Sequence, residues 1–308
     1  MRPVVWLASY PKSGNTWMRL LISALADRGE KLAINEMSER GGMASARGPF
    51  DSRLLIDSGL LTHDEIDALR PRLYEDMARD VQDANDADDD AADEHGLPVR
   101  FVKTHDAYTL TARGEPLLAG ARGAKAAIVI VRDPRDVAPS LANHLRTGLD
   151  AAIAFMDDPK AGFCVSERRQ PIQLRQLLPR WSGHVASWLD QRDLPIHLLR
   201  YEDLKRDTAA AFAAVLRFAG VTADDDAIAR AVALADFGRL QAQERESGFT
   251  EWQDRNAGGR LFFRRGETGA WRSELTPEQA ARIEAAHAPV MRRLGYDAAA
   301  AQAGTPSG

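Results

Sequence analysis

The strongest constraint on the fold is a series of short apolar segments that alternate with helical patterns along the chain. The clearest is the unbroken apolar run over 126–131, which is typical of a strand buried on both faces of a parallel sheet. Further strands are predicted at 4–8, 99–102 and 196–201. Strands that alternate with helices predict an α/β protein with an open, mostly parallel sheet flanked by helices. Ligands of such sheets bind at the carboxyl ends of the strands.

Apolar residues at helical spacing complete this pattern. Helices are predicted at 18–29, from 62 to 77, at 137–145, up to about 189, at 208–219, at 224–235 and at 276–294. Residues 30–60 are predicted to be loop and short helix, and 150–180 to begin irregularly. The Asp- and Ala-rich stretch 83–94 is predicted to be a linker rather than a flap over an acceptor site, and a metal site there is not favoured.

A loop with a cation, a glycine and two hydroxyl groups follows the first strand. It reads Tyr10-Pro11-Lys12-Ser13-Gly14-Asn15-Thr16-Trp17 and leads into a helix. Free backbone N–H groups and the helix dipole make such a place a binding site for phosphate. Lys12 adds a positive charge, and Ser13 and Thr16 add hydroxyl donors. The loop differs from the nucleotide triphosphatase loop GxxxxGK[ST], because Lys12 precedes its only glycine.

Two more basic motifs can bind phosphate. Arg132 follows the strand at 126–131, and Ser140 lies in the next helix, so that both can converge on one phosphate. Arg264, Arg265 and Gly266 form a basic loop whose backbone can close over an anion. The alternatives are a surface ion pair for Arg132 and an ordinary basic surface loop.

The whole chain is acidic, with a net charge of −5 at pH 7, which argues against nucleic acid as a partner. Cys164 is the only cysteine, which excludes an intramolecular disulfide and a cysteine-held metal cluster. There is no export signal and no apolar stretch of transmembrane length. These features predict a cytoplasmic protein without a membrane segment.

Together the motifs resemble those of the cytosolic-type sulfotransferases, which take a sulfuryl group from PAPS (3′-phosphoadenosine 5′-phosphosulfate). YPKSGNTW is similar to the family's 5′-phosphosulfate loop YPKSGTTW, and the amide of Asn15 can still donate. VIVRDPRDVAPS, over 129–140, resembles the 3′-phosphate motif. RRGETGAWR, over 264–272, resembles RKGxxGDWK, with Arg265 in place of Lys and Ala270 in place of Asp.

The resemblance implies a P-loop-nucleotide-kinase-like fold with a single domain over 1–308. A variable acceptor-side region is expected over about 30–98 and a flexible tail over about 298–308. The implied reaction moves a sulfuryl group from PAPS to a hydroxyl or amine of a small-molecule acceptor and needs no metal. Its second product is adenosine 3′,5′-bisphosphate. The acceptor cannot be identified, and the oligomeric state stays open between monomer and homodimer.

The resemblance also implies roles for individual residues. The nucleotide-binding residues are Lys12, Ser13, Gly14, Asn15, Thr16, Trp17, Arg132, Ser140, Tyr201, Phe237, Arg264, Arg265 and Gly266. Of these, the three aromatic residues are expected near the adenine, with core packing as the alternative. His105, in the segment VKTH, is implied as the general base, with Lys12 and Lys103 near the sulfuryl group. The remaining histidines are interpreted as surface or core residues: His63, His95, His144, His184, His197 and His287.

Two alternatives come from other classes of protein. A P-loop kinase or nucleotide triphosphatase would need a metal-binding aspartate at a strand end, for which Asp133 is the nearby candidate. A nucleotide-binding module without catalysis would not need both Lys103 and His105. Arg135 and Asp136 are expected to serve loop structure rather than the ligand. The sequence does not decide between the core and the acceptor pocket for four tryptophans: Trp6, Trp181, Trp188 and Trp252.

Overall fold

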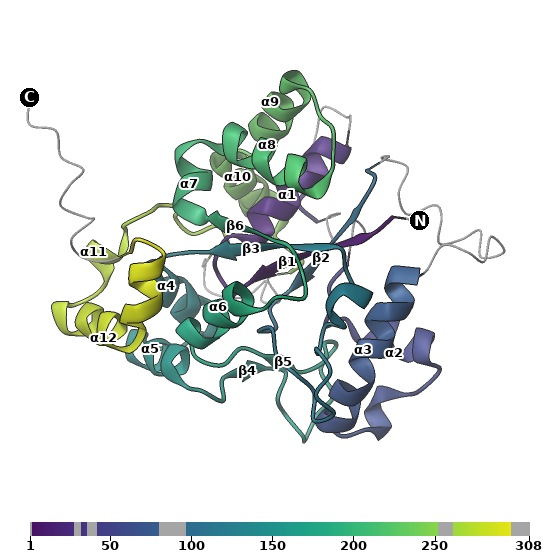
Figure 1. Cartoon of the computed structure of the whole chain (residues 1–308). Helices are drawn as coiled ribbons and strands as arrows, with labels where there is room; N and C mark the ends of the chain where they lie inside the picture. The colour runs from purple at the N-terminus through teal and green to yellow at the C-terminus, as the bar shows by residue number, and fades with distance from the viewer. Residues whose placement is uncertain (1, 28–31, 36–41, 80–96, 252–260, 297–308) are drawn as a thin grey trace, which may run out of the picture.

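The centre of the protein is a parallel sheet of four strands in the order β2-β1-β3-β6 (Figure 1). The computed structural model describes residues 2–27, 32–35, 42–79, 97–251 and 261–296. The strands are β1 Val4–Ser9, β2 Arg100–Thr104, β3 Ala126–Val131 and β6 Ile196–Arg200. The chain passes from β1 outward to β2 and then back across β1 to β3, so the strand order reverses beside β1.

Both faces of the sheet are covered, which explains the unbroken apolar strands. In β1, Val4, Trp6 and Ala8 belong to one hydrophobic core. Val5 and Leu7 belong to a second core on the opposite face. Every residue of β1 and β3 is buried. The prediction of a parallel sheet that is buried on both faces is therefore confirmed.

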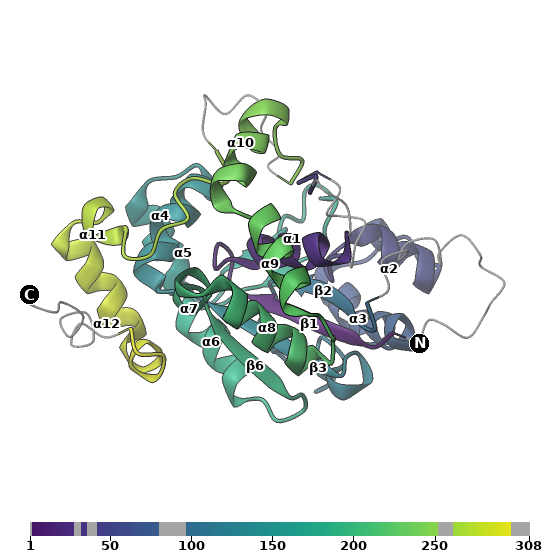
Figure 2. The same ribbon diagram turned by 90° about the horizontal axis from the view of Figure 1, so that it is seen from above.

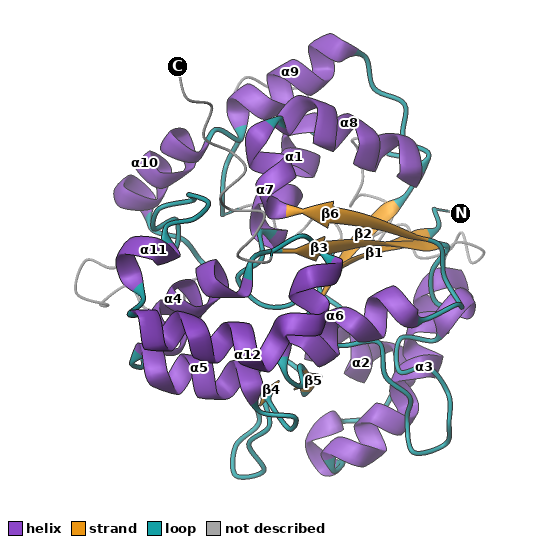
Figure 3. Cartoon of the chain, turned by 60° about the vertical axis from the view of Figure 1, so that its left-hand side comes forward, coloured by secondary structure: helices purple, strands orange, loops and turns teal. Residues whose placement is uncertain are grey.

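Helices form one layer on each face of the sheet (Figure 3). On one face, α1 Asn15–Ala26 packs beside α9 Asp225–Leu234, next to α8 Thr208–Ala219. On the other face, α12 Pro277–Arg293 contacts α4 Pro134–Leu145, α5 Leu149–Asp157 and α6 Trp181–Asp190. The result is a single α/β domain, as the sequence predicts.

Shorter elements surround this framework. The helices α2 Arg47–Leu54 and α3 His63–Arg79 lie at one end of the molecule, and α11 Trp271–Glu274 lies with α12 at the other (Figure 2). A separate antiparallel pair consists of β4 Gly162–Phe163 and β5 Gln176–Leu177. The remaining elements are η2 Ser58–Leu60, η4 Gly120–Arg122, α7 Tyr201–Arg206 and α10 Phe237–Ser247.

Most predicted boundaries agree with the structure, and the differences have local causes. The helices α8 and α9 match their predictions to within a residue, and a capping box at Thr276 begins α12. The helix α1 begins at Asn15, earlier than predicted, and β2 continues to Thr104. The expectation that 150–180 begins irregularly is wrong, because α5 occupies its first residues.

Some expectations fall on residues outside the described ranges. These are the stretch 83–94, the tail over about 298–308, His95 and Trp252. The other three tryptophans that the sequence left open belong to the core: Trp6, Trp181 and Trp188. Within the described part of the chain, no helix is both long and apolar enough to cross a membrane.

Candidate active site

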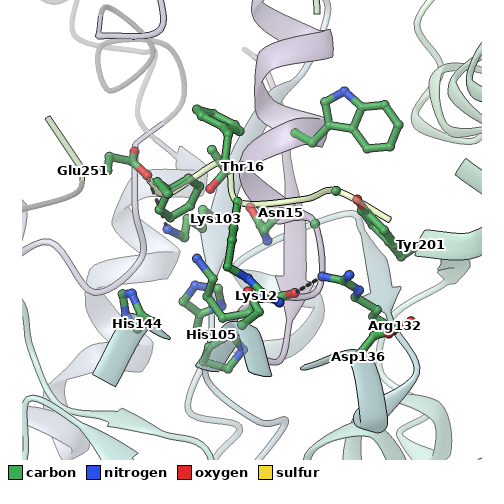
Figure 4. A pocket seen from close by; sticks show the side chains of 18 of the residues that line it. Lys12, Asn15, Thr16, Lys103, His105, Arg132, Asp136, His144, Tyr201 and Glu251 are labelled. Atoms are coloured by element: carbon green, nitrogen blue, oxygen red, sulfur yellow. Dashed lines mark hydrogen bonds and ion pairs between the residues drawn. The ribbon is translucent and has the colours of Figure 1, made fainter. Parts of the chain in front are cut away.

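A cavity of about 460 Å³ opens where the four strands of the main sheet end. Each strand is followed by a predicted site residue that lines it: Lys12 after β1, His105 after β2, Arg132 after β3 and Tyr201 after β6. Figure 4 shows these side chains around the same space. All other predicted site residues line this cavity too, with the exception of Ser13. The structure thus brings together motifs that lie far apart in the sequence.

The loop after β1 has a backbone that suits an anion. Lys12 and Gly14 have positive φ angles of 69° and 106°. A Cβ atom on Gly14 would lie 2.6 Å from the ring of Tyr201, so glycine is needed at this position. No side chain caps α1, so the first N–H groups of this helix are available to a ligand.

Two side chains of this loop differ from expectation. The Nδ2 amide of Asn15 donates to the Leu7 carbonyl (2.8 Å) and to the Ser9 hydroxyl (3.1 Å). Both donor hydrogens are used, so the expectation that this amide donates to a ligand is wrong; it ties the loop to β1 instead. Ser13 is buried behind the cavity wall, and its Oγ has no hydrogen-bond partner among the described residues.

Cationic side chains are concentrated in the cavity. Burial, reinforced by Lys103 and Arg132, lowers the pKa of Lys12 to about 7. Burial also lowers the pKa of Lys103 to about 8, although the nearby carboxylate of Glu251 raises it. Like charges held this close favour the binding of an anion, which would restore the ordinary pKa values. The cavity is therefore suited to a ligand with several negative charges.

Arg132 joins two loops at the edge of the cavity. Its guanidinium donates to the carbonyls of Lys12 (3.3 Å) and Glu267 (2.9 Å). It also packs over the ring of Tyr201, at 4.4 Å from the centroid. Its Nε atom is buried and has no hydrogen-bond partner in the described part of the chain. This leaves a buried polar group in the cavity wall that a bound oxyanion could satisfy.

Carboxylates fix the basic loop 264–272 over this region. Asp136 accepts the backbone N–H groups of Gly269 (2.6 Å) and Trp271 (2.9 Å). Glu274 pairs with Arg264 at 2.5 Å and with Arg265 at 3.4 Å. The expectation that Asp136 serves loop structure is confirmed by these two backbone contacts.

Asp133, the metal-ligand candidate of the kinase alternative, is hydrogen-bonded to Arg135. It caps α4 by accepting the backbone N–H of Arg135 at 2.9 Å. The guanidinium of Arg135 donates to the same carboxylate at 2.7 Å, to Glu284 at 2.6 Å and to the Tyr296 carbonyl at 2.8 Å. Both residues therefore have structural partners at the start of this helix, as expected for Arg135.

His105 is held in one orientation. Its Nδ1 atom lies 2.8 Å from the carbonyl oxygen of Ser9, a contact in which the nitrogen must donate. The lone pair of the neutral ring is then on Nε2. Burial, together with the charge of Lys103, keeps the pKa of His105 well below its usual value. The carbonyl of His105 accepts a hydrogen bond from the Nε2 atom of His184 (3.0 Å), which fixes the backbone as well.

His144 lines the cavity, although the sequence interpretation placed it at the surface or in the core. It follows Ser140 by four residues on α4, and Ser140 follows Asp136 by four, so the three share one face of the helix. That spacing could have indicated His144. Burial and two nearby lysines lower the pKa of His144 to about 3, so its ring is neutral. The ring lies against Phe163, with 5.8 Å between the centroids.

Glu251 is a second cavity residue that the sequence interpretation missed. Its carboxylate pairs with Arg19 at 2.6 Å and lies 3.8 Å from the Nζ atom of Lys103. Because no motif surrounds it, nothing in the local sequence indicated this position.

The three predicted aromatic residues lie together at one part of the cavity. The rings of Trp17 and Tyr201 meet edge to face at 5.9 Å, and the ammonium group of Lys205 lies over Trp17 and Phe237. A Cβ atom on Gly266 would collide with the ring of Phe237, so the basic loop can approach only because it has glycine there. Such a group of rings suits a flat aromatic base.

The fold brings a cluster of cationic and aromatic side chains to one cavity at the ends of parallel strands. Residues 2–295 match the sulfotransferase domain, and the chain belongs to this family. It is similar to cytosolic sulfotransferase 16 of Arabidopsis thaliana, with 24% identity across 92% of this chain and 75% of that protein. It is 26% identical to flavonol 3-sulfotransferase of Flaveria bidentis, across 91% of this chain and 79% of that one.

A solved structure supports the fold. Retinol dehydratase in complex with androsterone and the inactive cofactor PAP matches with a TM-score of 0.60 and 20% identity, across 95% of this chain and 82% of that chain. By its family, the protein is a sulfotransferase, an enzyme that transfers a sulfuryl group.

Proposed function

We propose that this protein transfers a sulfuryl group from PAPS to a hydroxyl or amine of a small-molecule acceptor in the cytoplasm. The observation that carries the proposal is that His105, Lys12 and Lys103 line the same cavity. The neutral ring of His105 has its lone pair on Nε2, because Nδ1 donates to the Ser9 carbonyl. The PAP found in the retinol dehydratase structure supports PAPS as donor, and relatives named cytosolic support the compartment.

The donor fits the residues of the cavity. Backbone N–H groups at the start of α1, with Lys12 and Thr16, would hold the 5′-phosphosulfate. Arg132 and Ser140 would hold the 3′-phosphate, and loop 264–272 would close over it. The aromatic side chains would enclose the adenine: Trp17, Tyr201 and Phe237. The buried, unpartnered Nε atom of Arg132 is consistent with a site completed by phosphate oxygens.

The residues of the cavity then have separate tasks. When bound, the donor supplies an electrophilic sulfur and a phosphate leaving group. His105 Nε2 takes the proton of the acceptor hydroxyl as the acceptor oxygen forms its bond to sulfur. The bond between sulfur and the phosphate oxygen breaks, and Lys12 and Lys103 balance the charge that develops there. The products are a sulfate ester and adenosine 3′,5′-bisphosphate, and His105 returns its proton to solvent.

A transfer assay with sulfur-labelled PAPS and a panel of phenols, alcohols and amines tests this function. We expect label in the acceptor with the wild-type protein. In the variant His105→Asn, we expect kcat to fall about 10²–10⁴-fold, while adenosine 3′,5′-bisphosphate still binds. The replacement His197→Asn, on strand β6 away from the cavity, is the control. No transfer to any hydroxyl or amine by the wild-type protein, or unchanged turnover by His105→Asn, would refute the proposal.

A further inference from the structure

A second part of the cavity is lined by side chains that the nucleotide roles do not use. The strands β4 and β5 pair Phe163 directly with Gln176, and both line the cavity. Directly paired residues of antiparallel strands have their side chains on the same face. Phe163 stacks on Phe155 (6.0 Å, 26° between planes) and contacts His144. An aromatic surface and an amide therefore lie side by side in the wall.

Gln176 is hydrogen-bonded to a second amide, that of Gln173. Its Nε2 atom donates to Gln173 Oε1 (2.8 Å), which also accepts from the Ser45 hydroxyl (3.3 Å). Gln176 is only 2% exposed, although it lines the cavity. Two amides joined by one hydrogen bond leave one carbonyl oxygen and further N–H groups unused. In the described part of the chain, no partner accepts from Gln173 Nε2 or donates to Gln176 Oε1.

The position of Gln176 is fixed by a buried ion pair. Arg70 and Asp106 are both 0% exposed and meet at 2.5 Å. Arg70 donates to the carbonyl of Arg175 (3.0 Å), and Asp106 accepts the N–H of Leu177 (2.8 Å). The residues on both sides of Gln176 are thus held by one ion pair.

The same ion pair is joined to His105, because Asp106 is the next residue in the chain. The carbonyl of Asp106 is held in turn by the indole N–H of Trp188 (3.0 Å). A common support therefore fixes the proposed base and the amide of Gln176 relative to each other. Such an arrangement suits a substrate with two polar groups at a set separation.

We propose that Gln173 and Gln176 bind a second polar group of the acceptor, which is uncharged. The favoured acceptors are aromatic hydroxyl compounds that carry another hydroxyl, a carbonyl or a carboxamide away from the hydroxyl that is sulfated. This inference rests on the proposed function, since it concerns the acceptor of the same reaction. The aromatic body lies against Phe163, and its second polar group meets one donor and one acceptor at the amide pair.

The surroundings of the amide pair favour an uncharged group over a carboxylate or an ammonium group. A carboxylate would meet the carbonyl oxygen of Gln176, which repels it, and the anionic donor would already pair with Lys12 and Lys103. An ammonium group would meet the donor N–H groups of Gln173. His144 is neutral and adds no charge to balance either one. A neutral group that both donates and accepts is the best match to the two amides.

The test compares matched acceptors in the sulfur-transfer assay. The probes are 2-naphthol, the dihydroxynaphthalene isomers, and a naphthol carboxylate and a naphthol amine of the same size. We expect at least one dihydroxy isomer to exceed 2-naphthol in kcat/KM by roughly tenfold, well above the twofold statistical factor. We expect the charged analogues to be poorer than that isomer.

Variants of Gln173 and Gln176 test whether the amide pair causes the preference for a dihydroxy acceptor. In Gln176→Met and in Gln173→Met, the ratio of kcat/KM between the preferred isomer and 2-naphthol is expected to fall to about the statistical factor. Gln170→Met, in the same segment but outside this cavity, should keep the wild-type ratio. Binding of adenosine 3′,5′-bisphosphate shows whether each variant is folded. If only one of the two glutamine variants is folded, that variant alone is enough for the test.

Each outcome bears on only one of the two proposals. Transfer to 2-naphthol without any preference among the acceptors would overturn this inference and leave the proposed function standing. A preference that persists in both glutamine variants would overturn it as well. The proposed function itself fails if no hydroxyl or amine compound receives the label, or if His105→Asn turns over as fast as the wild type.

Discussion

The fold holds Lys12 in a buried position beside other cations, where its charged form is destabilised until an anion binds. Its ammonium group lies 3.7 Å from the centroid of the Phe262 ring, and burial beside Lys103 and Arg132 lowers its pKa to about 7. The unfolded chain returns this pKa to 10.5, so between pH 7 and 10.5 the unfolded state binds more protons. The free energy of unfolding of the ligand-free protein should therefore rise with pH in this window because of Lys12.

We predict that Lys12→Met stabilises the ligand-free protein at pH 7 while weakening nucleotide binding. The gain should shrink as the pH rises from 7 toward 10.5, because the folded wild type has lost this charge and the cost of removing the proton falls with rising pH. Denaturant unfolding at several pH values measures this, with the exposed Lys160→Met as control. Lower stability of Lys12→Met at pH 7, or an unchanged pH slope, would show that the charge of Lys12 is not held at a cost.

At the scale of the elements, the segment after β2 is held by the buried ion pair of Arg70 and Asp106. In Asp106→Leu, the charge of Arg70 would remain buried without its main partner, and we expect a loss of about 3–5 kcal/mol in unfolding free energy. The double variant Arg70→Met with Asp106→Leu should regain most of that stability. Asp67 would still pair with Arg175 at 2.5 Å.

The same double variant separates stability from positioning. Its kcat should stay low, because the backbone of Arg175 and Leu177 is no longer held near His105. Nucleotide affinity should change little, since the loop after β1 does not contact the pair. Recovery of kcat together with stability would mean that the ion pair serves folding alone.

The carboxylate of Asp136 holds two backbone N–H groups of loop 264–272. Asp136→Asn keeps one acceptor oxygen but loses one of the two bonds to Gly269 and Trp271. We predict about tenfold weaker binding of adenosine 3′,5′-bisphosphate, mainly through faster dissociation, as stopped-flow fluorescence would show. Asp150→Asn, which breaks an exposed ion pair with Arg282, should leave the rate unchanged. Equal rates in wild type and Asp136→Asn would contradict this role.

The sequence predicted those elements in which local pattern and burial agree. Strand β3 is apolar throughout because both of its faces are covered. Arg132 directly follows its last residue, so the end of the strand indicated this site residue. The pair β4–β5 has two residues in each strand, too few for any periodicity, so the positions of Phe163 and Gln176 could not be predicted. Glu251 reaches the cavity only through tertiary packing, whereas His144 could have been found from its spacing to Ser140.

At the scale of the whole molecule, an acidic protein concentrates positive charge in one cavity. The net charge is −5, yet Lys12, Lys103, Arg132 and Arg264 all line the same space. The remaining acidic surface would repel a nucleotide weakly at long range, so binding depends on the cavity itself. An anion bound there should raise the pKa of Lys12 from its value of about 7.

We therefore predict that the protein takes up protons when it binds adenosine 3′,5′-bisphosphate at pH 8. Titration calorimetry in buffers of different ionisation enthalpy measures the number of protons directly. The affinity should fall as the pH rises from 7 to 9, and Lys12→Met should remove most of the proton uptake. Binding without proton uptake at pH 8 would show that Lys12 is already charged in the free protein.

The most direct measurement is calorimetric titration with adenosine 3′,5′-bisphosphate and, separately, with ATP and magnesium, on the wild type and on Arg132→Ala. We expect tight binding of the bisphosphate, weak binding of ATP, and loss of the bisphosphate affinity in Arg132→Ala, because Arg132 joins both loops of the site. A preference for ATP with magnesium, or bisphosphate binding that does not depend on Arg132, would contradict the assignment of this cavity to PAPS.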